Sequence, residues 1–427
     1  MSRGDPGALL DRCGLPFVVR RPERLGVAVS GGSDSMALLD LMVRKGAELG
    51  FPVSAVSVNH GLRAEAVDEV AHVATFCAAR GIDHSVLEWS GWDGHGNLQA
   101  EARRARYQLI ADWADGSGVD CVALGHTEDD QAETVLMSIA RKSGVDGLAG
   151  MASRFERHGV EWIRPLLEQP REVLRDYLRS KNIRWCDDPS NEDVRFERVE
   201  VRRALKVLSS LGIDAKSLAR VASNAGVAKS ALDHYAHSEV AEHELVTEDR
   251  GDLVFPEGFT TQERQVPGEV ARRLQLLAFQ WVSGSLYPPR MSAVVDMNAE
   301  MTDADRHTLG GCVVLRQKGK GWVGNTIRIT REFNAVKDVV SSTNGVWDGR
   351  WVLAGPHEPD LRVRALGEAL KDCPNWRETG LARQSLLASP AIWRGEELIA
   401  APLAGFANSW TASATGRGSF AKFLLSR

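Results

Sequence analysis

A glycine-rich turn at residues 30–35 is the segment of the sequence best suited to hold an anion. In order, it reads Ser30, Gly31, Gly32, Ser33, Asp34 and Ser35. The two glycines lack the Cβ atoms that would keep a phosphate at a distance, and the turn's backbone N–H groups favour negative charge. Asp34 would repel such a ligand unless a cation bridged the two, which predicts Mg²⁺. The alternative is a plain strand-to-helix turn with Ser33 as the N-cap.

A group of acids opens a second helical pattern, which begins after the apolar run at 120–124. On a helix, Asp129 and Glu133 are four residues apart and Asp130 and Glu133 three apart, so their carboxylates gather on one side of the first turn. Clustered acids beside a phosphate site could share a magnesium ion or hold a cationic substrate. The alternative is a capping box between Thr127 and Asp130, because acids commonly favour a helix N-terminus.

Bulk composition is that of a globular protein of about three domains. The chain has 427 residues, of which 43% are apolar and 26% charged, and a net charge of −5. No apolar stretch approaches the roughly 20 residues that cross a bilayer, and the N-terminal residues lack an apolar signal core. The six cysteines include no C-x-x-C pair. We therefore expect a cytoplasmic protein with no membrane partner.

Short apolar runs alternate with helical patterns in the first part of the chain. The expected strands are 25–29, 53–58 and 120–124, and the expected helices 35–45, 65–80 and 98–114. This alternation predicts an α/β fold, a doubly wound and mostly parallel Rossmann-like sheet with helices on both faces. Ligands of such sheets bind at the carboxyl ends of the strands, so the chemistry is expected there.

The rest of the chain changes pattern, and three domains are expected, at 1–208, 209–337 and 345–427. The second is predicted to be mainly helical, with helices at 209–238 and 268–283 and a strand pair at 311–317 and 322–330. A polar stretch at 341–345 resembles a linker. The last segment is predicted to be a small α+β C-terminal module.

The turn at 30–35 fits neither a Walker A loop nor a dinucleotide fingerprint. Placed after a buried strand, it resembles the pyrophosphate-binding loop of the ATP pyrophosphatase (PP-loop) superfamily, whose members split ATP between its α and β phosphates. Further blocks resemble the tRNA(Ile)-lysidine synthetase family in order and spacing over about residues 25–208. They lie at 58–63, 102–107, 125–136, 138–144, 147–151, 164–167 and 187–191, followed by Arg198 and Arg202. Two departures are Val199, where the family usually has asparagine, and Asn59, where histidine is common.

The resemblance implies an ATP-dependent ligase with ATP and Mg²⁺ as cofactors. Its partners would be the CAU-anticodon isoleucine tRNA and free L-lysine, and it allows a homodimer. ATP binding is implied for the six turn residues, His60, Gly125 and His126. Catalytic roles are implied for Asp34, Asp130, Glu133 and Arg198, metal binding for Asp34 and Asp130, and substrate or tRNA contacts for Arg63, Arg103, Arg106 and Arg202. The alternative for each arginine is a solvated charge on a helix face, and residues 345–427 are expected to bind tRNA.

Three other functions fit parts of the pattern. A tRNA-thiolating relative would share the glycine loop, but the related group usually carries paired cysteines. A small-molecule amidating ligase of the same superfamily would act without RNA. A catalytically inactive RNA-binding scaffold would not release pyrophosphate from ATP.

Overall fold

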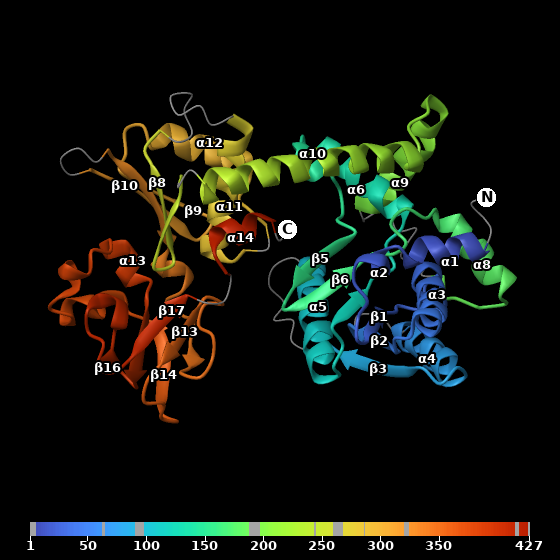
Figure 1. Cartoon of the computed structure of the whole chain (residues 1–427), viewed down its shortest axis with the longest axis horizontal. Coiled ribbons are helices and arrows are strands. Elements are labelled where there is room, and N and C mark those ends of the chain that lie inside the picture. Colours follow the sequence, from blue (N-terminus) through green and yellow to red (C-terminus); the bar gives the residue numbers. More distant parts are fainter. Residues whose placement is uncertain are drawn as a thin grey trace. The chain divides into compact units, whose positions relative to one another are not determined.

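The computed structural model describes residues 6–61, 65–89, 98–187, 197–242, 245–258, 268–285, 287–319, 324–414 and 418–425. The chain forms two compact units, residues 1–230 and 231–427, each with its own hydrophobic cores (Figure 1). None of the described helices combines the length and apolar character needed to cross a membrane.

A six-stranded sheet forms the centre of the first unit, in the order β3-β2-β1-β4-β6-β5. Its strands are β1 (Leu25–Ala28), β2 (Val53–Asn59), β3 (Asp83–Glu88), β4 (Cys121–Ala123), β5 (Arg154–Arg157) and β6 (Val160–Ile163). Every neighbouring pair is parallel except β5 and β6. The doubly wound, mostly parallel α/β fold predicted for this part of the chain is confirmed.

Helices cover both faces of this sheet because its central strands are apolar on both sides. Alternate residues of a strand point to opposite faces, and Cys121 and Ala123 of β4 join one core while Val122 joins the other. The first core contains residues of α1 (Pro6–Gly14), α3 (Ser33–Leu49), α4 (Glu65–Ala78) and α8 (Arg171–Ser180). The second contains residues of α5 (Leu98–Gly116).

The remaining elements of the first unit extend from the sheet. They are α2 (Pro16–Val19), α6 (Glu128–Ala140), α7 (Val145–Leu148), α9 (Glu197–Leu208), the 3₁₀ helix η2 (Ser209–Leu211) and α10 (Ala215–Ala241), which continues into the second unit. Ala132 and Val135 of α6 pack against Leu218 and Ala222 of α10. Helix α6 is thereby fixed at the carboxyl end of β4, where its acidic first turn begins.

Strand β1 lies between β2 and β4, so the chain winds outward from it in both directions. In doubly wound sheets the ligand site lies in the crevice where the winding reverses, outside the carboxyl ends of the strands. Here that point falls between β1, which leads into residues 30–35, and β4, which leads into residues 125–133. The two motifs found in the sequence therefore meet at one edge of the sheet.

The second unit begins with helices and an antiparallel sheet. The sheet has five strands in the order β7-β8-β11-β10-β9. The helices of this part are α11 (Gly268–Ser283) and α12 (Met291–Glu300). The strands are β7 (Thr247–Asp249), β8 (Asp252–Pro256), β9 (Arg306–Leu309), β10 (Cys312–Gln317) and β11 (Thr326–Arg331). The expected strand pair corresponds to β10 and β11, which are antiparallel; residues 320–323 of the expected turn and second strand lie outside the described residues.

The C-terminal segment contains two small sheets, ordered β12-β14-β15-β16 and β13-β17. Its elements are β12 (Ser341–Ser342), β13 (Trp351–Ala354), β14 (Leu361–Ala365), α13 (Arg383–Leu387), β15 (Pro390–Arg394), β16 (Glu397–Ala400), β17 (Thr411–Ala414) and α14 (Phe420–Leu425), with short 3₁₀ helices between them. The linker-like stretch instead starts with β12, which pairs with β14. Helix α14 packs back into the core around α11. The three-domain division stays a prediction.

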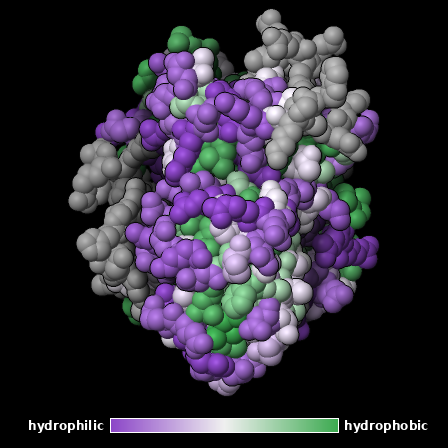
Figure 2. All heavy atoms as spheres, turned by 90° about the vertical axis from the view of Figure 1, so that its left-hand side faces the viewer, coloured by the Kyte–Doolittle hydropathy of each residue, from purple (hydrophilic) through white to green (hydrophobic). Residues whose placement is uncertain are grey.

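Figure 2 shows the face of the molecule that is on the left in Figure 1. This face is mostly hydrophilic, with apolar areas between polar ones. This agrees with a sequence in which 26% of the residues are charged.

Candidate active site

Residues 30–35 form a closed turn between β1 and α3. The Ser30 backbone N–H donates to Ser35 Oγ at 3.1 Å, and Ser35 Oγ donates to the Gly32 carbonyl at 3.0 Å. Gly31 has φ of +87°, a conformation that favours glycine. A Cβ added at Gly32 would meet protein atoms only at ordinary contact distances of 3.8 and 3.9 Å. The backbone conformation therefore explains the glycine at position 31, whereas contacts within the protein do not require a glycine at position 32.

The N-cap of α3 is Gly32, a residue that has no side chain with which to cap the helix. The alternative in which Ser33 is the N-cap is wrong, because Ser33 lies inside the helix and its hydroxyl donates to Asp34 Oδ1 at 3.1 Å. Orphan N–H groups at a helix start require an acceptor. The first amides of α3 therefore receive no acceptor from the side chain of their N-cap residue.

The second motif touches this loop through Gly125. A Cβ at Gly125 would lie 3.2 Å from both N and Cα of Ser35, closer than nine in ten such contacts. Thr127 is the N-cap of α6 and forms the expected capping box with Asp130. Asp130 Oδ2 accepts from the Thr127 backbone at 2.9 Å and from its hydroxyl at 2.8 Å. This cap occupies Oδ2 of Asp130 and leaves its other oxygen, Oδ1, for a partner from another helix.

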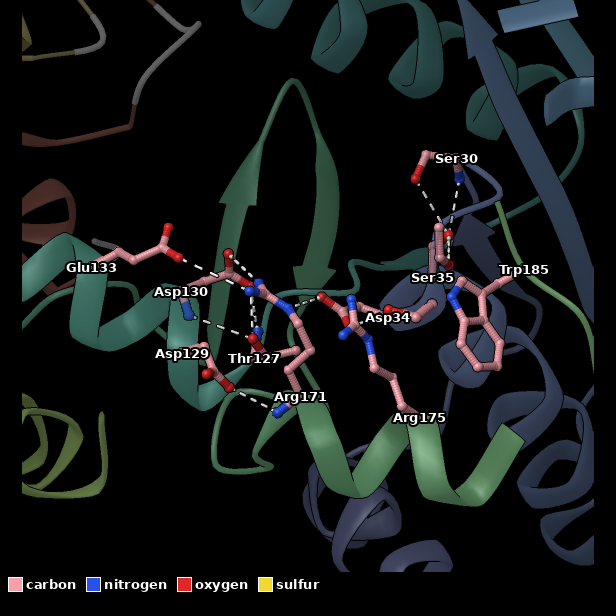
Figure 3. A network of polar contacts seen from close by, with 12 residues as sticks. Ser30, Asp34, Ser35, Thr127, Asp129, Asp130, Glu133, Arg171, Arg175 and Trp185 are labelled. Carbon is pink, nitrogen blue, oxygen red and sulfur yellow. Dashed lines mark hydrogen bonds and ion pairs between the residues drawn. The ribbon is translucent and has the colours of Figure 1, made fainter. Parts of the chain in front are cut away.

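Arg171, the first residue of α8, joins the two motifs (Figure 3). Its Nε donates to Asp34 Oδ2 at 2.9 Å and its Nη2 to Asp130 Oδ1 at 3.2 Å, while Nη1 lies 4.0 Å from Glu133 Oε1. Its backbone N–H donates to Asp129 Oδ2 at 2.7 Å. One residue therefore contacts acids from α3 and α6.

Charges in the cluster differ in their protonation behaviour. Burial raises the pKa of Asp34, although Arg171 opposes the shift. Burial also raises the pKa of Glu133, whose carboxylate is 1% exposed, against the opposing Arg202. Burial alone would raise the pKa of Asp130, but Arg171 and the hydrogen bonds from Thr127 outweigh it and lower the pKa. Asp130 is therefore the most firmly ionised of the three.

The two histidines at the strand ends accept hydrogen bonds from arginines. Arg164 Nε donates to His126 Nδ1 at 3.2 Å, and burial followed by the Arg164 charge lowers the pKa of His126 to about 3. His126 is therefore neutral at physiological pH, and with Nδ1 accepting, its proton lies on Nε2. Arg106 contacts His60 Nε2 through Nη2 at 3.0 Å.

The expected arginines occupy different places. Arg202 Nε donates to Glu133 Oε1 at 2.6 Å, so it belongs to the acid cluster. Arg103 and Arg198 are close enough to His126 for their charges to lower its pKa. Arg63 lies outside the described residues. The site thus has an acidic part around Arg171 and a basic part around His126.

Sequence reasoning did not single out Arg171. Its local signal is a basic residue at the first position of a helix, directly after Pro170, where the helix dipole disfavours positive charge. Such a residue needs a compensating acid, and the sequence does not show which one.

Magnesium binding is compatible with the donors present. Among the residues that the structure describes, no three acidic, histidine or cysteine side chains form a ready metal site. Mg²⁺ is usually held by one or two carboxylates together with substrate phosphates. Asp34 meets this requirement because its Oδ1 accepts only from the adjacent, rotatable Ser33 hydroxyl among the described contacts. Both oxygens of Asp130 are already hydrogen-bonded.

The fold and this loop define a PP-loop ATP-using enzyme, and the PP-loop domain model matches residues 11–208. A tRNA(Ile)-lysidine synthase of Ruegeria pomeroyi is 47% identical over 98% of this chain and 98% of that protein. One from Wolbachia pipientis is 33% identical over 89% and 88%. The chain belongs to the tRNA(Ile)-lysidine synthase family, a family of ATP-dependent ligases. A solved U34-tRNA thiolase of Methanococcus maripaludis aligns at 19% identity and a TM-score of 0.45, over 51% of this chain and 78% of that one.

Proposed function

We propose that the loop at 30–35 and the acids around Arg171 form the site at which this chain makes lysidine. In this reaction the C2 oxygen of the wobble cytidine in the CAU-anticodon isoleucine tRNA attacks the α-phosphorus of ATP, and pyrophosphate leaves. The ε-amino group of free L-lysine then attacks C2, and AMP leaves. The observation that carries the proposal is that Arg171 joins Asp34 of the glycine loop to Asp130 of the acid cluster, at the point where the sheet reverses its winding.

The loop is proposed to hold the phosphates of ATP. The N-cap residue of α3, Gly32, offers the first amides of that helix no side-chain acceptor, and a ligand at Gly32 would account for a glycine that protein packing does not require. Fixed amide donors stabilise the charge that develops on the leaving pyrophosphate, because they need no rearrangement during the reaction. Asp34 is the proposed holder of Mg²⁺, which would neutralise phosphate charge.

The acidic part is proposed to receive the ammonium end of lysine. Asp130 and Glu133 already bind cationic groups, the guanidinium groups of Arg171 and Arg202. A lysine ammonium offers three donors to the same kind of acceptor. The incoming amine must lose a proton before it attacks. Glu133, whose pKa is raised by burial, is the acid best suited to take that proton.

The basic part is proposed to face the adenylate and the tRNA backbone. Arg103, Arg106 and Arg198 have no carboxylate partner within ion-pair distance among the described residues. Unpaired arginines are suited to bind phosphate. His126, neutral and protonated on Nε2, adds an uncharged donor. We place this reaction in the cytoplasm, and a homodimer stays a prediction.

The test is transfer of labelled lysine to RNA. Purified protein is incubated with ATP, labelled L-lysine and a CAU-anticodon isoleucine tRNA transcript, and a transcript with a GAU anticodon is the control. We expect label in the CAU transcript only, and only with ATP. Asp34→Asn should abolish transfer while tRNA binding persists. Absence of label in both transcripts would refute the proposed reaction, and full activity of Asp34→Asn would remove the role given to that carboxylate.

A further inference from the structure

Arg175 lies one helical turn after Arg171 on α8, so the two side chains leave the same face of the helix. In Figure 3, Arg171 reaches the acids of α6, whereas Arg175 extends toward the part of the network that holds Asp34. Both arginines therefore approach the site from one face of α8, and Arg171 is hydrogen-bonded to Asp34 and Asp130, whereas Arg175 is not.

Arg175 has few partners for a side chain in this position. Its Nη2 lies 3.8 Å from Asp187 Oδ1, beyond hydrogen-bond distance, and that oxygen already accepts from Trp185 Nε1 at 3.1 Å. Asp187 is 80% exposed, so this ion pair is weak. The Arg175 Nε is shielded from solvent and has no hydrogen-bond partner among the described residues. This guanidinium therefore has N–H donors that can bind a ligand.

The segment beside Arg175 is docked on the glycine loop. The Cys186 backbone N–H donates to the Gly31 carbonyl at 2.9 Å, and the Cys186 carbonyl would lie 3.9 Å from a Cβ at Gly32. Asp187, the partner of Arg175, is the next residue. The segment that ends in Asp187, the nearest acid to Arg175, therefore lies against Gly31 and Gly32 of the loop.

We propose that Arg175 binds the pyrophosphate end of ATP, and the free pyrophosphate after cleavage. This inference rests on the proposed function, in which the loop at 30–35 holds the phosphates. A planar guanidinium matches two phosphate oxygens at once. Arg171 cannot take this role without leaving Asp34 and Asp130. Arg175 therefore contacts the β- and γ-phosphates, which ATP carries and AMP lacks. The loop amides contact the phosphates of ATP both before and after pyrophosphate is released.

The test is titration calorimetry of the full-length protein with ATP, AMP and inorganic pyrophosphate. We compare the wild type with Arg175→Met and with Arg179→Met, a control from the same helix whose guanidinium pairs with the exposed Glu172 and Asp176. For Arg175→Met we expect the Kd of ATP and of pyrophosphate to rise about tenfold, as for the loss of one charge-assisted contact. The Kd of AMP should change less than about twofold, and Arg175→Lys should restore part of the affinity.

The outcomes separate this inference from the proposed function. If the wild type binds ATP and pyrophosphate and Arg175→Met binds them equally well, Arg175 has no such role and the proposed reaction is unaffected. If Arg175→Met weakens AMP as much as ATP, the residue acts on the whole site and the specific role is refuted. If the wild type binds no ATP at all, both proposals fail. Equal melting temperatures of the wild type and the three variants would exclude misfolding as the cause.

Discussion

Replacing Arg171 by methionine removes a cation that touches acids from two helices. Arg171 is 21% exposed, and its partners Asp34 and Asp130 are 18% and 10% exposed. Breaking a buried ion pair by removing one partner costs about 3–5 kcal/mol, because the remaining charge is left without compensation. Since Arg171 and Asp34 keep some contact with water, we expect the lower end, about 3 kcal/mol of local stability.

Hydrogen exchange of peptides that cover the start of α6 and α8 measures this loss, because exchange reports local opening. A cost of about 3 kcal/mol corresponds to roughly 100-fold faster exchange. The effect should depend on pH. Burial raises the pKa of Asp34 and Glu133, and loss of Arg171 would raise both further. The native variant then binds more protons than the unfolded chain, so its stability falls as pH rises through the raised pKa values.

The loss of local stability in Arg171→Met, relative to the wild type, should therefore be larger at pH 8 than at pH 5.5. The comparison is made after correction for intrinsic exchange rates. Arg179→Met serves as the control, because its exposed ion pairs contribute little. Exchange within about threefold of the wild type at both pH values, or a deficit that grows as pH falls, would refute the reasoning that Arg171 compensates these acids.

Three further predictions concern single residues. Gly125→Ala places a Cβ 3.2 Å from the Ser35 backbone, so the loop must shift, and we expect the KM for ATP to rise roughly tenfold with tRNA binding unchanged in a gel-shift assay. His126 has a pKa of about 3, so its ring proton signals in NMR should stay constant between about pH 5 and pH 8. Glu133→Gln removes a charge from the proposed lysine site, and the KM for lysine should rise about tenfold or more while tRNA-dependent pyrophosphate release continues.

Each of these has a clear contrary result. A wild-type KM for Gly125→Ala would show that the loop does not depend on that close approach. A His126 signal that titrates near the ordinary histidine pKa would show that the ring is not desolvated. Loss of pyrophosphate release in Glu133→Gln would move this residue from the second step of the reaction to the first.

The central strands of the fold were predictable because their residues are apolar on both sides. The apolar run predicts a strand at 25–29, and β1 spans Leu25–Ala28. Strand β3 (Asp83–Glu88) was not foreseen, since it is an edge strand in which every residue keeps some exposure to solvent. The hairpin β5–β6 has only four residues in each strand, too few for a clear periodic signal.

The site was predictable as far as its residues are close in the sequence. The loop residues and the acids Asp130 and Glu133 lie in two short motifs, each of which follows a buried strand. Arg171 is 137 residues from Asp34 and 41 from Asp130, and only the packing of α3, α6 and α8 brings them together. A contact of this kind leaves no local pattern beyond an unfavourable charge at a helix start.

The measurement that tests the central claim most directly is the trapping of the adenylated tRNA. The protein is incubated without lysine, with ATP labelled at the α-phosphate and the CAU-anticodon transcript. The proposed site predicts that labelled AMP becomes attached to this transcript, that Asp34→Asn prevents it, and that adding lysine releases the label as AMP. If lysine is incorporated but no AMP–RNA species that lysine discharges can be trapped, the claim is contradicted. It is also contradicted if, with ATP labelled at the γ-phosphate instead, label stays on the RNA.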